Sequence, residues 1–295
     1  MKIGVLCSRV RLEEKLLFQA LRNRGVDFER IDVRQVTFDL TGTPAKEHPF
    51  SEFDAVLIRC VSYSRALYAA RLMHMQGIRA VNPYQVMITC GDKMLTTLAL
   101  AEHGVPTPRT AVAFSETAVL ARIEKMGYPA VLKPPVGSWG RLMAKVNDRQ
   151  AAEAVLEHKM HDAKCRAQEV AFYVQDYVDK PGRDIRTLVV GDETIYAVYR
   201  HSSHWITNTA RGGHTSSLAF ARGDEVDRLS RAAARAVGGG VVAVDLLEAP
   251  DGSLLVNEVN HTPEFHGAMQ AAGVDIAGRI VDYVVEAARS SRRVT

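Results

Sequence analysis

The first ninety residues alternate short β-rich runs with amphipathic helices, and this alternation constrains the fold more than any other feature of the sequence. Lys2–Cys7 reads as a strand, and the helical pattern that follows it ends at Gly25. Phe53–Arg59 and Ile78–Val81 read as further strands, with a helix over Tyr63–Met75 between them. Such alternation predicts a parallel sheet. No Gly-x-Gly-x-x-Gly follows the first strand, which argues against a dinucleotide-binding sheet.

The pattern changes toward antiparallel pairs further along the chain. Ala130–Pro134 and Leu142–Val146 read as two strands that flank a glycine-bearing loop. One hairpin is expected from Ile185 to Tyr199, with its turn at Gly191 and Asp192. A second hairpin pairs Val241–Glu248 with Ser253–Val259, and a final helix starts at Asp275. We therefore expect an α/β region at 1–88, a small lobe at 89–167 and a mainly antiparallel lobe at 168–295.

Charge and cysteine usage exclude several classes of protein. The 37 basic and 34 acidic side chains leave a net charge of only +3, so an extensive nucleic-acid interface is not expected. The apolar run after Met1 is too short for a signal peptide, and no later run has the length of a membrane span, so we expect a cytoplasmic protein. The four cysteines are far apart and form no Cys-x-x-Cys pair, which predicts free thiols.

Two lysines stand where apolar packing does not explain them. Lys93 lies in an expected helix over Asp92–Glu102, and Lys133 ends the apolar run of the strand at Ala130–Pro134. Either lysine alone is more typical of a solvated side chain. The segment Pro135–Arg141, however, follows Lys133 directly with two glycines, a hydroxyl and an arginine. Backbone N–H groups and positive charge suit a polyphosphate, so we expect a phosphate-binding loop at 136–141 that is not a P-loop.

Three oxygen-bearing side chains are expected to converge on the last hairpin. Asp245 lies on one strand, while Glu258 and Asn260 lie two residues apart on the other and therefore share a face. Carboxylates with an amide oxygen suit Mg²⁺, whereas zinc would call for cysteine or histidine. Because both strands are strongly apolar, an unpaired buried carboxylate would cost several kcal/mol without a cation. We therefore expect a metal site, with a solvated hairpin face as the alternative.

Arginines and a long polar loop accompany the preceding hairpin. Arg186 and Arg200 lie in this hairpin or directly after it, and Arg211 lies in the glycine-ended loop Trp205–Gly213. Arginines that face a metal-bound phosphate can stabilise the charge on a phosphoryl group in transfer. Surface salt bridges are the alternative for each arginine. Long loops of this kind usually carry function.

Together, these motifs resemble the RimK-like branch of the ATP-grasp fold. The resemblance rests on Lys93, on Lys133 with Gly137–Gly140, on Asp184–Arg186 and on Asn257–Asn260, and it covers nearly the whole chain. Within that branch, Ser203–Gly213 and Asn257–Thr262 are similar to ligases of the LysX type, which serve amino-group-carrier lysine biosynthesis. The resemblance implies an ATP-grasp fold that is α/β, with an α+β C-terminal part, and is preceded by a Rossmann-like N-terminal domain at 1–88. The central ATP-grasp lobe would span 89–167, and the lobe with the metal and substrate site 168–295.

The resemblance also implies roles for particular residues. ATP would lie between the two lobes, with 136–141 as its covering loop and Gln175–Val178 as the adenine hinge. The implied ATP-binding residues are Lys93, Lys133, Gly137, Ser138, Trp139, Gly140, Gln175, Asp176, Tyr177, Val178 and Asp184. Two Mg²⁺ ions would be held by Asp245, Glu258 and Asn260. The implied catalytic residues are Arg186, Arg200 and Asn208, and the implied substrate-binding residues are His204, Thr209, Ala210, Arg211, Gly212, Glu264 and His266.

The implied reaction converts a carboxylate to an acyl phosphate, which an amine attacks to give an amide, ADP and phosphate. In LysX-type enzymes the carboxylate is the C-terminal glutamate of LysW, a small acidic carrier protein, and the amine is that of α-aminoadipate. Pro263 and His266 depart from the family pattern, and a neutral histidine binds a distal carboxylate less strongly than lysine or arginine does. Glutamate in arginine synthesis, or another amino acid in a specialised pathway, is therefore the alternative substrate, and a non-catalytic ATP-binding regulator is a further alternative. We also expect a homo-oligomer, either a dimer or a tetramer.

Overall fold

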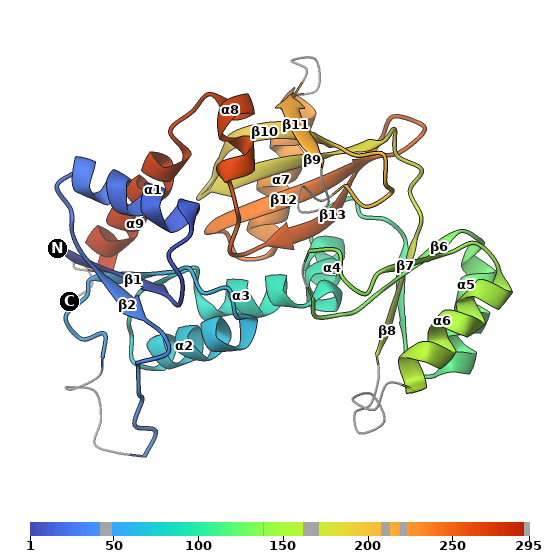
Figure 1. Ribbon diagram of the computed structural model, residues 1–295, viewed down its shortest axis with the longest axis horizontal. Helices are drawn as coiled ribbons and strands as arrows, with labels where there is room; N and C mark the ends of the chain where they lie inside the picture. The colour runs from blue at the N-terminus through green and yellow to red at the C-terminus, as the bar shows by residue number, and fades with distance from the viewer. Residues whose placement is uncertain (42–48, 138, 162–170, 208–212, 219–222, 292–295) are drawn as a thin grey trace.

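The computed structural model describes residues 1–41, 49–137, 139–161, 171–207, 213–218 and 223–291. Within these residues the strands form three sheets. Figure 1 places the N-terminal sheet (strands within residues 2–81) at the left. The largest sheet (within 183–260) lies above the centre, and the sheet with the fewest strand residues (within 110–176), called the smallest sheet below, lies at the lower right. No helix in these ranges is long and apolar enough to cross a membrane.

The N-terminal sheet is parallel, as the alternation of strands and helices predicts. Its strand order is β2-β1-β3-β4, and each neighbouring pair runs parallel. Helices α1 and α9 contribute to an apolar core on one side of it, and α2 to a core on the other. The bounds are β1 Lys2–Cys7, α1 Leu12–Asn23, β2 Asp27–Asp32, β3 Ala55–Ile58, α2 Tyr63–Met75, β4 Ala80–Val81 and α9 Ile276–Ser291.

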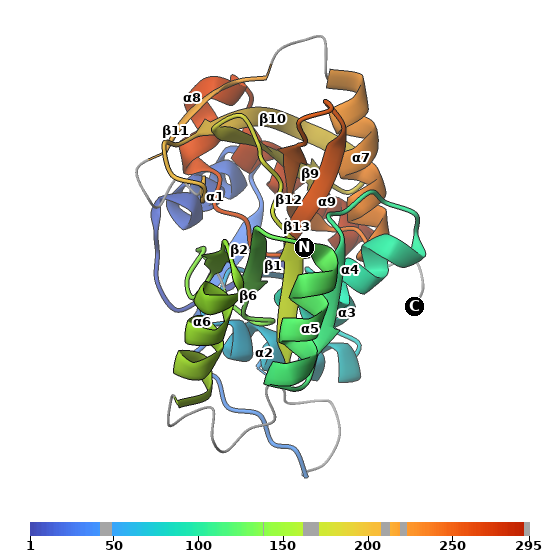
Figure 2. The same ribbon diagram turned by 90° about the vertical axis from the view of Figure 1, so that its right-hand side faces the viewer.

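The smallest sheet is antiparallel and has the order β5-β8-β6-β7. Helices α5 and α6 share a core with it, and they lie nearest the viewer in Figure 2. The bounds are β5 Thr110–Ala113, α5 Glu116–Met126, β6 Ala130–Lys133, β7 Ala144–Val146, α6 Arg149–His161 and β8 Phe172–Asp176. The prediction that a strand begins at Leu142 is wrong, because Leu142 has a φ of 56° and its side chain is 89% exposed. A left-handed backbone cannot pair in a sheet.

The largest sheet carries both predicted hairpins. Its order is β11-β10-β9-β12-β13, with antiparallel pairs throughout. Helix α7 packs on one face with Val226, Leu229 and Ala233 buried. The bounds are β9 Arg183–Val190, β10 Glu193–His201, β11 His214–Ser217, α7 Gly223–Ala236, β12 Val241–Glu248, β13 Leu254–Asn260, η3 His266–Ala268 and α8 Met269–Ala272.

Two helices and one asparagine connect the N-terminal sheet to the rest of the molecule. Helix α3 (Tyr84–Gly91), which the sequence analysis did not predict, leads into α4 (Lys93–Glu102) along the lower part of Figure 1. Asn82 donates to the carbonyls of Val241 and His261 at 2.8 and 2.7 Å and accepts from the Val241 N–H. A Cβ at Gly240 would lie 2.2 Å from the Asn82 amide oxygen, so glycine is needed for this close approach.

Candidate active site

Two cavities adjoin each other between the smallest and the largest sheets. The first is lined by β6, β8 and the loop after β6 on one side and by β12 and β13 on the other. The second extends toward α1 and the segment after β13. Both cavities are lined by Gly137, Trp139, Arg200, Asp245 and Glu258. A molecule in the first cavity would therefore lie directly beside one in the second.

Lys133 is a buried cation that faces the first cavity. Its side chain ends β6, is only 5% exposed and donates to the Gln175 and Asn257 amide oxygens at 2.5 and 2.9 Å. Burial lowers the pKa of Lys133 to about 8, and the nearby Glu258 carboxylate only partly counteracts this. A lysine held in this way exchanges little with solvent and is ready to receive negative charge.

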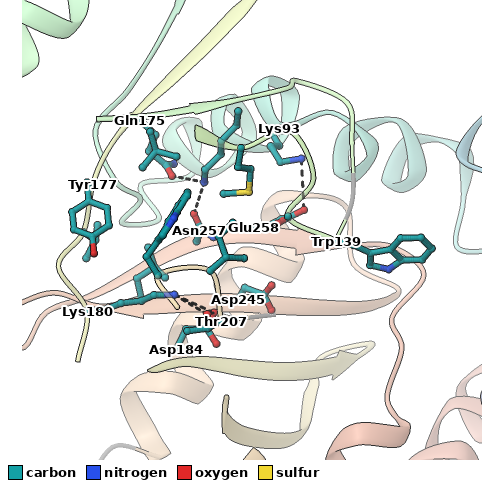
Figure 3. A pocket seen from close by; sticks show the side chains of 18 of the residues that line it. Lys93, Trp139, Gln175, Tyr177, Lys180, Asp184, Thr207, Asp245, Asn257 and Glu258 are labelled. Carbon is teal, nitrogen blue, oxygen red and sulfur yellow. Dashed lines mark hydrogen bonds and ion pairs between the residues drawn. The ribbon is translucent and has the colours of Figure 1, made fainter. Parts of the chain in front are cut away.

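Lys93 ties α4 to the glycine-bearing loop. Its ammonium donates to the Gly137 carbonyl at 2.8 Å and lies 3.9 Å from a Glu258 carboxylate oxygen. Figure 3 shows Lys93 and Glu258 facing each other, while Trp139 points away from the cluster. Trp139 adopts a φ of 60° and is 40% exposed. The loop lines the first cavity with Gly137, Trp139, Gly140 and Arg141.

A third lysine, Lys180, lies across the first cavity near the Asp184 carboxylate (Figure 3). It donates to the Thr207 hydroxyl at 2.7 Å, and burial lowers its pKa. Asp184 accepts from Arg200 at 2.8 and 2.7 Å and from the Thr207 hydroxyl at 2.5 Å. Burial alone would raise the pKa of Asp184, but the positive charges of Arg200 and Lys180 outweigh that effect and lower it.

Asp245 and Glu258 stand opposite each other across β12 and β13, as the predicted metal site requires. Burial of Asp245 does not by itself require a cation, however, because this carboxylate lies 2.9 Å from Arg186 and 3.1 Å from Arg200. Burial would lower the pKa of Arg200, and the charges of Asp245 and Asp184 outweigh it and raise the pKa. The described residues form no cluster of three or more His, Cys, Asp or Glu side chains suited to a metal. Asn260, the third predicted ligand, lines the second cavity.

The far end of the second cavity is built from ion pairs between α1 and the segment after β13. Arg11 binds Glu14 through Nε and Nη2 at 3.0 and 2.9 Å, and its Nη1 donates to Glu264 at 2.8 Å. Glu13 lies 2.5 Å from Nδ1 of His266. The Arg11–Glu264 and Glu13–His266 pairs each join residues 253 positions apart, so the N-terminal domain contributes to the same cavity as the C-terminal lobe.

The buried Arg59 donates hydrogen bonds to two groups of this network. It is 3% exposed and donates to Glu14 at 3.1 Å and to the Pro263 carbonyl at 3.0 Å. Burial lowers the pKa of Arg59 despite the charge of Glu14. The neighbouring His261 is neutral at pH 7, because burial and the charge of Arg59 lower its pKa to about 4.

The predicted site residues fall into four groups. Those that line the first cavity are Lys93, Lys133, Gly137, Trp139, Gly140, Gln175, Asp176, Tyr177, Val178, Asp184, Arg200, Asp245 and Glu258. The second cavity also takes in Arg186, Asn260, Glu264 and His266. His204 is exposed beside Trp205 and is not one of the residues that line either cavity. Ser138, Asn208, Thr209, Ala210, Arg211 and Gly212 lie outside the described residues, so their roles stay predictions.

Several residues of the site were not predicted from the sequence, among them Lys180, Asn257 and Arg11. Lys180 lies in a polar stretch, Asp179–Gly182, that reads as an ordinary turn. Asn257 belongs to a motif that was recognised, but its contact with Lys133 depends on the fold. Arg11 precedes the first helix, and nothing in the sequence around it indicates a contact with Glu264.

Family models match the two parts of the chain in turn. A LysX preATP-grasp domain matches residues 3–89, and a RimK-like ATP-grasp domain matches residues 90–284. The second match covers more than half of the chain. The protein therefore belongs to the RimK-like ATP-grasp family of ligases, and the predicted fold is confirmed.

Similar proteins narrow the class further. The chain is 34% identical to "Glutamate--LysW ligase ArgX" of Sulfurisphaera tokodaii, over 97% of this chain and 99% of that protein. It is 33% identical to "Alpha-aminoadipate--LysW ligase LysX" of Saccharolobus solfataricus, over 80% and 85%. Among solved structures, the RimK domain protein ATP-grasp from Sphaerobacter thermophilus aligns with a TM-score of 0.79 at 27% identity, covering 97% of this chain and 100% of that one. This chain therefore resembles the LysW ligases along almost its whole length.

Proposed function

We propose that this protein uses ATP to join the α-amino group of an amino acid to the C-terminal glutamate of a small acidic LysW-type carrier protein. The observation that carries the proposal is the wall shared by the two cavities. One cavity contains buried lysines suited to phosphates, and the other contains the charged groups expected around an amino acid. A carboxylate at this boundary can then receive the phosphoryl group from one cavity, and its carbonyl carbon can be attacked by an amine from the other, beside Arg200, Asp245 and Glu258.

The residues of the first cavity fit ATP with Mg²⁺. ATP would supply the phosphoryl group that activates the carrier carboxylate, and Mg²⁺ would neutralise phosphate charge. Lys133 and Lys180 are buried cations that face the cavity, and both gain an anionic partner if a polyphosphate binds there. Asp245 and Glu258 provide carboxylate oxygens at the boundary of the cavities, which suits a hard cation.

The arginines of the shared wall orient the groups that react. Arg200 is held on two sides by Asp184 and Asp245, so its guanidinium has little freedom to move. Arg186 shares Asp245 with it. A fixed cation at this point stabilises negative charge on the activated carboxyl group without reorganising during the reaction.

The first candidate for the amino acid is α-aminoadipate, because Ser203–Gly213 and Asn257–Thr262 resemble ligases of the LysX type. Glutamate is the second candidate, because two relatives that are 34% and 33% identical to this chain are named as glutamate--LysW ligases. Both amino acids have a second carboxylate, and the guanidinium of Arg11 in the far part of the second cavity favours such a substrate over an apolar one.

Mass spectrometry of the carrier tests the proposal. The protein is incubated with ATP, Mg²⁺, a LysW-type carrier and one amino acid at a time, and the expected result is a carrier heavier by one amino-acid residue. The control is the same carrier without its terminal glutamate, which should stay unmodified. Equal amide formation with both carriers would contradict a carrier-protein ligase and favour a ligase of small molecules. ATP binding without turnover for any amino acid would favour the non-catalytic regulator.

A further inference from the structure

Arg11 holds a position in the second cavity that the proposed chemistry does not yet use. It lies at the start of α1, far in sequence from the lobes that bind ATP, yet it lines the cavity together with Glu264 and His266. Its guanidinium is planar and presents its N–H groups in a fixed fork. A group that binds one edge of this planar guanidinium therefore also determines where its other edge points.

One side of the Arg11 fork is fixed by a buried carboxylate. Glu14 is fully buried, accepts from Arg11 Nε and Nη2 and also accepts from the Arg11 backbone N–H at 2.9 Å. Arg59 holds Glu14 from the opposite side at 3.1 Å. Burial alone would raise the pKa of Glu14, but its bonds to Arg11 and the charge of Arg59 outweigh that effect and keep it ionised. Arg11 is thus anchored before any substrate arrives.

The other side of the fork faces a carboxylate that can move. Nη1 of Arg11 donates to Glu264 at 2.8 Å, and the Glu264 side chain is 41% exposed, whereas that of Glu14 is 0% exposed. An exposed glutamate loses little when it turns into water. The Arg11–Glu264 contact is therefore the exchangeable one, and the Arg11–Glu14 contact is the fixed one.

We propose that Arg11 binds the side-chain carboxylate of the amino-acid substrate, and that Glu264 gives up its place on Nη1 when this carboxylate enters. The inference rests on the proposed function and deepens it, because it names the residue that selects an acidic amino acid. Glu264 released in this way remains beside the cavity, where it can offset the positive charge of the substrate's ammonium group. Arg59 acts as a positioning residue, since it reaches Arg11 only through Glu14.

A simple latch between the two domains is the competing explanation. In that case the Arg11–Glu264 pair would hold α1 against the segment after β13 and would treat all amino acids alike. Selectivity between substrates separates the two explanations. Glutamine differs from glutamate only by the exchange of a carboxylate for a neutral amide, so the pair probes the charge alone.

The experiment measures kcat/KM for glutamate and for glutamine, with carrier and ATP saturating, in the wild type and in Arg11→Gln. If the carrier assay identifies α-aminoadipate as the substrate, α-aminoadipate and its side-chain amide take the place of glutamate and glutamine. The wild type should prefer glutamate. Arg11→Gln should lower kcat/KM for glutamate by about 10- to 100-fold, the range expected for the loss of one charge-assisted hydrogen-bonded contact. Its values for glutamine and its KM for ATP should stay near those of the wild type. Arg22→Gln, an exposed arginine on the same helix, is the matched control and should change neither.

Arg11→Lys is a second variant, and its result does not depend on how well the Arg11→Gln protein folds. It keeps one positive charge but loses the fork, so glutamate should suffer a smaller loss than in Arg11→Gln, again with glutamine unaffected. An equal loss for glutamate and glutamine in either variant would overturn the proposal in favour of a latch, as would a wild type without preference for glutamate. A wild type that ligates no amino acid at all would instead refute the proposed function itself.

Discussion

The buried ammonium group of Lys133 should make the free energy of unfolding rise measurably as the pH is raised. Its pKa is about 8 in the folded protein against an ordinary value of 10.5, because burial disfavours the charged form. Below pH 8 the ammonium is charged in both the folded and the unfolded states, and the cost of burying it is fully present. Between pH 8 and 10.5 the unfolded chain holds more protons than the folded one, so the free energy of unfolding rises with pH.

The size of this effect follows from the shift. A displacement of 10.5 to about 8 corresponds to about 3 kcal/mol at about 1.4 kcal/mol per pKa unit. Most of this gain should appear between pH 8 and 10. Lys133→Met removes the titrating group and keeps a side chain of similar length, so the wild type should gain about 3 kcal/mol relative to the variant between pH 7 and 10.5.

Urea unfolding of both proteins at several pH values between 7 and 10.5 checks this prediction. Subtracting the variant from the wild type cancels the titration of all other groups. Lys125→Met, at an exposed position on α5, is the control and should unfold in parallel with the wild type. If the free energies of unfolding of the wild type and of Lys133→Met differ by a constant amount over this range, Lys133 is not a buried ammonium with a lowered pKa. The same titration should weaken ATP binding above pH 8, because a neutral amine attracts phosphate less.

Other perturbations test separate parts of the site. Glu258→Gln should abolish amide formation while far-UV circular dichroism stays unchanged, because its proposed role is to hold Mg²⁺; activity like that of the wild type would contradict the role. Trp139→Ala should raise the ratio of ADP to amide by admitting water to the acyl phosphate, and an unchanged ratio would place the shield elsewhere. Arg200→Met should lower the free energy of unfolding by about 3–5 kcal/mol, since it leaves Asp184 and Asp245 buried without this partner; a loss below 1 kcal/mol in urea unfolding would argue against that pairing. The rate of association with an acidic carrier, followed by stopped flow, should fall from low to moderate salt more than ATP affinity does, and equal changes would speak against electrostatic steering.

Local sequence signals located most of the elements. Ser115 caps α5 with its hydroxyl, Gly127 follows the end of that helix, and the hairpin turn lies at Gly191 and Asp192 as predicted. Helix α3 escaped prediction, because Asn82-Pro83 reads as the end of a strand and because its eight residues are mostly apolar without a clear polar face. Its packing between two parts of the molecule, rather than a periodic pattern, determines where it forms.

The site was predictable where residue type and order carry the signal. Lys133, Asp245 and Glu258 are charged residues in or at the end of apolar strands, and the structure brings all three to the first cavity. The pairing of Asp245 with two arginines was not predictable, because it depends on the register of β9, β10 and β12. The hydrogen bond from Arg11 to Glu264 joins residues from the two ends of the chain, and no local sequence pattern indicates it.

The joint core of β1, α1 and α9 bears on how this protein is made in the cell. Ile3 and Leu17 pack in one cluster with Ile280 and Val284 of the last helix, and Figure 1 shows α9 lying against the N-terminal domain. During translation, the apolar face of α1 emerges from the ribosome long before α9 has been synthesised. The N-terminal domain therefore remains incomplete until α9 has been synthesised and has left the ribosome, and a nascent chain stalled before residue 276 would expose that face to chaperones.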